Sequence, residues 1–247
     1  MQRKLEICAG DYASAVAALR GGADRIELCS GLSEGGITPS LALIEKAVEL
    51  ERIKVHVLIR PRPGDFLYTH DECAIIIRDI RLAVEAGADG VVVGCLTPDG
   101  QVDADMLSSF VAAAGGRNVT FHRAFDVCKS PLQALQTIAD CGCNRILTSG
   151  QAATATQGIP MIKELVRVSP ANITIMAGSG VNPSNALAIL REAGVAELHA
   201  SARTVHPSLM HYRHQGVAMG TPGSDEYSIQ QTSEDLVKAL KEKLEQA

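Results

Sequence analysis

Short apolar runs alternate with longer amphipathic stretches from one end of the chain to the other. The runs are nearly apolar throughout and are bounded by Gly, Asp or Asn, as expected of strands that are buried on both faces of a parallel sheet. They are Lys4–Cys8, Arg25–Cys29, Ile53–Arg60, Gly90–Gly94, Val119–Arg123, Arg145–Ser149, Ile173–Gly178 and Glu197–Ala200. The pattern predicts eight strands, each followed by a helix.

The stretches between the runs have the period of a helix. They lie near residues 12–22, 40–50, 71–86, 103–114, 131–141, 158–168, 184–193 and 234–245. Thr38-Pro39 and Ser130-Pro131 each offer an N-cap followed by proline at the first helical position. Four glycines fall where a helix is expected to end, namely Gly22, Gly87, Gly142 and Gly194.

Eight strand–helix units without a linker predict one α/β domain over residues 1–247, a (β/α)8 TIM barrel. A partial repeat supports this fold: Gly-Gly-Ala-Asp at 21–24, Ala-Gly-Ala-Asp at 86–89 and Ala-Gly-Val-Ala at 193–196. A doubly wound open sheet is the second choice. It is disfavoured because no glycine-rich dinucleotide turn follows the first strand.

One segment, at about 203–233, separates the last strand from the final helix by an unusually long stretch. Segments of this length inside a compact domain are often lids or recognition loops. Met210, Tyr212, Met219 and Pro222 are residues of the kind expected in such a lid. The alternative is a surface loop without such a function.

Composition excludes several classes of function. A net charge of -5, no Trp and only 3% aromatic residues argue against a nucleic-acid-binding surface. No apolar run reaches the roughly 18–20 residues that span a membrane. The first strand begins at once, which leaves no room for a signal peptide. Seven cysteines without a Cys-x-x-Cys pair indicate free thiols in a reducing compartment, so we expect a cytoplasmic protein.

Polar residues gather at the carboxyl ends of the predicted strands, where barrel enzymes carry their active sites. The acid–base candidates are Glu6, Glu27, His122, His199 and Asp126, and the candidate anion clamps are Arg60 and Arg123. This set suits a lyase, isomerase or aldolase-like enzyme acting on a small phosphorylated or carboxylated metabolite. The alternative is a buried ion-pair layer of the two glutamates against the two arginines, with the histidines in the core.

A glycine-rich turn after the seventh strand is a candidate phosphate site, because barrels often bind phosphate through free N–H groups there. The candidate residues are Gly178, Ser179, Gly180 and Val181, with Ser201 after the eighth strand. A tight turn that needs glycine is the alternative.

Two thiols are the best metal candidates. Cys8 and Cys29 end neighbouring strands at equivalent places, and soft sulfur ligands select Cu(I). Neighbouring strands are offset in a barrel, so the two sulfurs need not meet. Cys141-x-Cys143 falls at the opposite end of the barrel, and His211-x-x-His214 has no third ligand nearby.

These motifs together resemble the CutC family, named for copper homeostasis. The matching segments are 5–8, 25–29, 34–40, 59–66, 121–126, 146–150, 176–181, 197–199 and 225–227. The resemblance spans essentially the whole chain. It implies a cytoplasmic β/α barrel that forms a homo-oligomer, a dimer or tetramer, and binds Cu(I) through Cys8 and Cys29. A copper-binding factor and a metabolic enzyme therefore both remain open.

Overall fold

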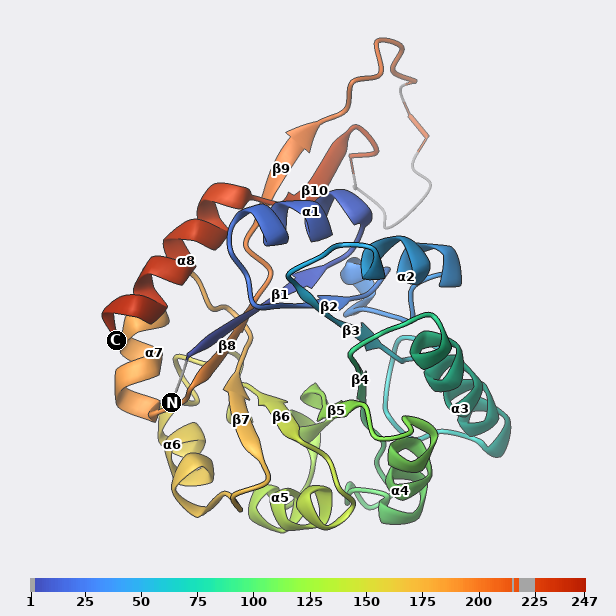
Figure 1. Cartoon of the computed structure of the whole chain (residues 1–247), viewed down its shortest axis with the longest axis vertical. Coiled ribbons are helices and arrows are strands. Elements are labelled where there is room, and N and C mark those ends of the chain that lie inside the picture. The colour runs from blue at the N-terminus through green and yellow to red at the C-terminus, as the bar shows by residue number, and fades with distance from the viewer. Residues whose placement is uncertain (1–2, 215, 218–224) are drawn as a thin grey trace.

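Eight parallel strands close into a barrel in chain order, and helices surround it (Figure 1). The structure is a computed structural model that describes residues 3–214, 216–217 and 225–247. The last strand of the barrel pairs with the first, with Lys4 opposite Glu197. The TIM barrel is therefore confirmed, and the open doubly wound sheet is wrong.

The barrel strands lie close to their predicted positions. They are β1 (Lys4–Ala9), β2 (Arg25–Leu28), β3 (Lys54–Leu58), β4 (Gly90–Val93), β5 (Asn118–Phe121), β6 (Arg145–Thr148), β7 (Thr174–Ala177) and β8 (Glu197–Ala200). The helices are α1 (Tyr12–Arg20), α2 (Leu41–Val48), α3 (His70–Glu85), α4 (Ala104–Ala113), α5 (Pro131–Asp140), α6 (Ile159–Val168), α7 (Ala186–Ala193) and α8 (Glu234–Gln246). Among the described residues, no helix combines the length and apolar character needed to cross a bilayer.

Of the two helices that were predicted to begin at a proline, one does so. Helix α5 begins at Pro131, directly after Ser130. Helix α2 instead begins after Ser40, whose Oγ accepts the N–H of Leu43 at 3.3 Å, so the predicted start at Thr38-Pro39 is wrong. The Thr38 hydroxyl accepts the Arg60 N–H at 2.9 Å, which fastens this segment to the end of β3.

The four predicted helix-ending glycines all adopt left-handed backbone conformations. Their φ values are 83° at Gly22, 102° at Gly87, 91° at Gly142 and 74° at Gly194. A side chain at these positions would be strained, so glycine is required to turn each helix toward the next strand.

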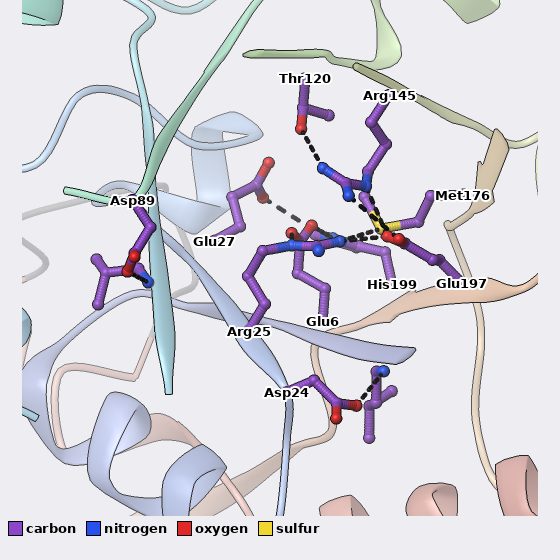
Figure 2. Close-up of polar contacts among 12 residues, drawn as sticks. Glu6, Asp24, Arg25, Glu27, Asp89, Thr120, Arg145, Met176, Glu197 and His199 are labelled. Atoms are coloured by element: carbon purple, nitrogen blue, oxygen red, sulfur yellow. Dashed lines mark hydrogen bonds and ion pairs between the residues drawn. The ribbon is translucent and has the colours of Figure 1, made fainter. Parts of the chain in front are cut away.

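A short polar side chain before β2, β4 and β6 binds the start of the preceding strand, and we call these contacts strand-start clamps. The acceptor and donor N–H pairs are Asp24 with Leu5 (2.8 Å), Asp89 with Val55 (3.0 Å) and Asn144 with Val119 (2.8 Å). Figure 2 includes Asp24 and Asp89. The position before β8 is Ala196, which offers no side-chain acceptor. The partial repeat in the sequence thus marks a recurring contact that is missing from the last pair of strands.

The long segment before α8 forms an antiparallel hairpin of β9 (Arg203–Pro207) and β10 (Ser228–Thr232), which we call the arm together with the described residues between them. The arm extends outward past α1, and its described part does not lie over the barrel interior (Figure 1). Met210 and Tyr212 are exposed on it. Met219 and Pro222 lie outside the described residues. The arm therefore does not have the position expected of a lid over the mouth.

Candidate functional site

Buried ion pairs cross the interior of the barrel (Figure 2). The Arg25 guanidinium donates from Nε to Glu6 and from Nη2 to Glu197 Oε2, the latter at 2.5 Å. Arg145 binds the same Glu197 through Nε at 2.6 Å and Nη2 at 3.1 Å. Burial alone would raise the pKa of Glu6, but Arg25 and His199 hold that pKa well below its usual range. Glu6 is therefore an ionised member of this layer.

The ion-pair layer expected as an alternative exists, but the predicted partners were wrong. Glu6 pairs with Arg25, whereas Arg60 and Arg123 bind other groups. The expected layer contained only residues near the carboxyl ends of the strands. Arg25 stands at the start of its strand, yet it lies in register with Glu6 because neighbouring barrel strands are staggered. The charged residues at the starts of the strands, such as Arg25, were the feature of the sequence from which these ion-pair partners could have been predicted.

His199 on β8 connects this layer to the mouth of the barrel. Its Nδ1 lies 2.8 Å from Glu6 Oε1, and its Nε2 lies 3.7 Å from Glu27 Oε2. Burial opposes a charge on the ring, but Glu27, Cys8 and Glu6 together raise the pKa of His199 well above its usual value. Burial also raises the pKa of Glu27. Protonation of His199 is therefore favoured beside Glu27, and both groups lie in a largely buried environment.

Cys8 completes a cluster of possible metal ligands with Glu27 and His199. One ligand atom from each residue lies within 4.8 Å of the other two. The Cys8 Sγ is also 3.5 Å from the Cys29 Sγ. A hydrogen bond with Cys29 and burial raise the pKa of the Cys8 thiol well above its usual value. The offset between neighbouring strands therefore does not keep the two sulfurs apart.

A cavity of about 370 Å³ opens at the mouth beside this cluster. Its lining comprises Cys8, Glu27, Glu34, Gly35, Leu58, Arg60, Phe66, His122, Arg123, Asp126, Val127, Leu147 and His199. Most of the predicted catalytic residues thus surround one cavity, and Glu6 lies beneath it. The apolar wall residues were not predicted, because an apolar residue near a strand end looks like core in the sequence.

Arg60 and His122 are both buried at this cavity. The Arg60 Nη1 donates to the carbonyls of Glu34 and Gly36, each at 3.1 Å, and Nη2 donates to the Gly64 carbonyl at 2.7 Å. The His122 Nδ1 accepts the N–H of Ala124 at 3.1 Å. Burial and the nearby Arg60 lower the pKa of His122 to about 3. His122 is therefore a neutral imidazole at physiological pH.

Arg123 and Asp126 lie on a short 3₁₀ helix, Arg123–Val127, that follows β5. The Asp126 carboxylate accepts from the Thr148 hydroxyl at 2.5 Å and from the N–H and hydroxyl of Ser149. Arg123 Nε donates to Asp126 at 2.8 Å, and its side chain is 45% exposed at the rim. Asp126 thus fastens the 3₁₀ helix to the end of β6, while Arg123 remains accessible to an anion.

The predicted phosphate residues do not line this cavity. Ser179 and Gly180 have φ values of 81° and 70°, and the Ser179 hydroxyl donates to the Ala153 carbonyl at 3.0 Å. A Cβ at Gly178 would lie 2.5 Å from Leu147. Val181 is buried and Ser201 is half-buried. The glycines thus have evident roles in turns and close packing, and phosphate binding there stays a prediction.

The fold and the site define a class: a TIM barrel whose mouth carries thiol, imidazole, carboxylate and guanidinium groups around one small cavity. The chain belongs to the CutC family, whose model matches residues 3–204.

Several relatives support this assignment. Family protein CutC of Chromobacterium violaceum is 46% identical over 247 residues and covers 100% of both chains. The human protein named copper homeostasis protein cutC homolog is 46% identical over 237 residues, 96% of this chain and 87% of its own length. A crystal structure of CutC from Streptococcus agalactiae has a TM-score of 0.77 at 33% identity and covers 81% of this chain and 99% of that one.

Proposed function

We propose that this protein acts in copper homeostasis by binding Cu(I) at Cys8 and Cys29, with His199 as a third ligand. The observation that carries this proposal is the 3.5 Å separation of the two sulfurs at the edge of the mouth cavity. Two thiols and an imidazole form a soft donor set, which favours Cu(I) over hard cations. The names of the human relative and of the Streptococcus agalactiae structure agree with a role in copper homeostasis.

The surroundings of the three ligands favour such a site. Glu6 lies 2.8 Å from the His199 Nδ1, and this contact leaves Nε2 on the side of Cys8 and Glu27. A carboxylate behind a histidine ligand orients the ring and raises its basicity. All seven cysteines are free thiols, which fits the reducing cytoplasm, where we propose the protein works.

An anaerobic titration against a Cu(I) chelator tests the proposal. The wild type is expected to bind stoichiometric Cu(I), and Cys8→Ser/Cys29→Ser is expected to lose this binding while it keeps its circular dichroism spectrum. Cys141→Ser is the matched control, since Cys141 is a half-buried thiol outside the mouth. Equal binding by the double variant and the wild type, or no binding by the wild type, would show the proposal to be wrong.

We also propose that the protein forms a homo-oligomer through the arm. Leu209, Met210 and Tyr212 on the arm are 93%, 59% and 72% exposed. Adjacent apolar side chains left in water commonly mark a contact surface. A second copy of the chain is the partner that the family resemblance implies.

A further inference from the structure

A second cavity opens at the amino ends of the strands, at the opposite end of the barrel from the mouth. Its volume is about 320 Å³. The residues that line it are Lys4, Arg25, Lys54, His56, Asp89, Gly116, Arg117, Asn118 and Arg145. Five of them are Lys or Arg and one is a carboxylate, whereas the whole chain carries a net charge of -5. The positive charge is therefore a local feature, and we call this cavity the basic opening.

The starts of three alternate strands surround the basic opening. Lys4 and Lys54 begin β1 and β3, and Asn118 begins β5. Because alternate residues of a strand share a face, each lies on the face that carries the interior residues two positions further along. Gly90 on β4 has no side chain to close this end of the barrel, and a Cβ there would lie 2.7 Å from the His56 Nε2. The barrel thus leaves an open end with basic side chains around it.

The two arginines beneath the opening are already neutralised. Arg25 pairs with Glu6 and Glu197, and Arg145 pairs with Glu197 (Figure 2). The side chains of the two arginines are only 5% and 8% exposed. They form the floor of the opening, and we assign no ligand contact to them.

The rim carries basic side chains that a ligand can reach. Lys4 and Arg117 are exposed, and neither forms an ion pair with any described residue. Lys54 binds Asp89, the carboxylate of the lining, at 2.7 Å, yet its own side chain is 70% exposed. Like charges around one opening repel each other, and a bound anion would offset this cost. Two cations without a counter-charge and a third accessible one therefore surround the cavity.

A glycine turn at the rim leaves room for a ligand beside Arg117. Gly115 and Gly116 have φ values of 57° and 86°, and a Cβ at either position would meet nothing within 4 Å. Glycine adopts these conformations without strain. A small anion at the rim can therefore approach the backbone of this turn closely.

We propose that the basic opening binds a small, multiply charged phosphate anion, such as a triphosphate group, through Lys4, Lys54 and Arg117. A guanidinium can bind two phosphate oxygens at once, and an ammonium group neutralises phosphate as a point charge. Three cations from separate elements favour a ligand with several negative charges, and about 320 Å³ admits only a small one. The opening lies at the other end of the barrel from Cys8 and Cys29, so the proposal does not depend on copper binding.

Calorimetry on the full chain tests this proposal, with inorganic triphosphate in a buffer without Mg²⁺ as the probe. The wild type is expected to bind it saturably. Lys4→Gln/Arg117→Gln is expected to weaken binding about tenfold or more, because it removes two charged donors from the rim. The matched control is Lys163→Gln/Arg81→Gln, which changes the net charge equally at exposed helix positions and should bind as the wild type does. Equal weakening in both double variants would mean general attraction by charge and would overturn the proposal.

Nuclear magnetic resonance of the ¹⁵N-labelled wild type locates the site without any variant. Triphosphate is expected to shift the amide signals of Gly115, Gly116 and Asn118 and to leave that of Gly35 at the mouth unchanged. Shifts at the mouth alone, or none at millimolar triphosphate, would show that the basic opening is not the site.

Adenosine triphosphate and citrate define the chemistry of the ligand. Tighter binding of the nucleotide than of inorganic triphosphate would identify a nucleotide as the ligand, and equal binding would identify the phosphate chain alone; both results support the proposal. Citrate carries several negative charges but no phosphate. If citrate binds as tightly as triphosphate does, the assignment to phosphate is wrong.

Discussion

At the scale of single residues, the buried arginines differ in what neutralises them. Arg25 and Arg145 pair with carboxylates inside the barrel, whereas Arg60 is held by carbonyl groups of two loops. The first two residues therefore stabilise the barrel interior. The third instead fastens the loops at the mouth, even though all three look alike in the sequence.

Removal of Arg25 should be costly. Arg25→Met leaves Glu6 and Glu197 without their shared cation, and breaking a buried pair on one side typically costs roughly 3–5 kcal/mol. Urea denaturation would measure this loss. The control is Arg78→Met, which removes an exposed pair with Glu85 at 3.7 Å and should cost less than about 1 kcal/mol. Similar losses in the two variants would contradict a stabilising role for the buried layer.

At the scale of the elements, the strand-start clamps explain why the partial repeat recurs. Asp24, Asp89 and Asn144 each accept a backbone N–H that the preceding strand would otherwise leave without a partner at its start. Ala196 interrupts the series beside a cavity of about 220 Å³ that is lined by Ile175 and Val195.

A clamp introduced at this position should therefore stabilise the protein. In Ala196→Asn, the new side chain would lie next to Ile175, the counterpart of Leu5 and Val55 in the other clamps. We expect a gain of about 1 kcal/mol, the usual net value of one hydrogen bond, as a higher urea midpoint. Ala196→Val fills similar space without an acceptor and serves as the control. An equal gain in both variants would mean that packing, and not the hydrogen bond, is responsible.

The Asp89 clamp should make stability depend on pH. Although partial burial opposes ionisation, Lys54 and the Val55 N–H lower the pKa of Asp89, so its ionised form is favoured by folding. This contribution is present above the unfolded-state pKa and is lost as the pH falls through the lower folded-state value. Asp89→Asn should therefore be less stable than the wild type at pH 7 and nearly equal to it in strong acid. Denaturant midpoints measured across this range check the trend, with the exposed Asp99→Asn as the control.

At the scale of the whole molecule, hydrophobic periodicity predicted the eight barrel strands, their order and the surrounding helices, because each buried strand is an apolar run of its own. The arm was not predicted as a hairpin, since its strands are exposed and have no apolar pattern. The mouth was predicted from the polar residues at strand ends. The ion-pair partners inside the barrel were not predicted, because they depend on the stagger between neighbouring strands, as Glu6 and Arg25 show.

The arm should govern self-association. We expect Leu209→Ser/Tyr212→Ser to reduce the molar mass measured by light scattering, because the change removes large apolar side chains from the proposed contact. Leu41→Ser on α2 is the control, as its side chain is 41% exposed and does not belong to the arm. An unchanged mass in the double variant, or a monomeric wild type, would contradict assembly through the arm.

The absent clamp at Ala196 also has a consequence for motion. Native-state hydrogen exchange proceeds through local openings, and these begin where a structure is held by the fewest contacts. Among the four strand pairs, β7 and β8 lack the side-chain contact that fastens the others, and β8 carries His199. We therefore expect the amides at the start of β7 to exchange earlier than those of β1, β3 and β5. The quarter of the barrel that supplies the central histidine of the mouth would then be the one that opens most readily.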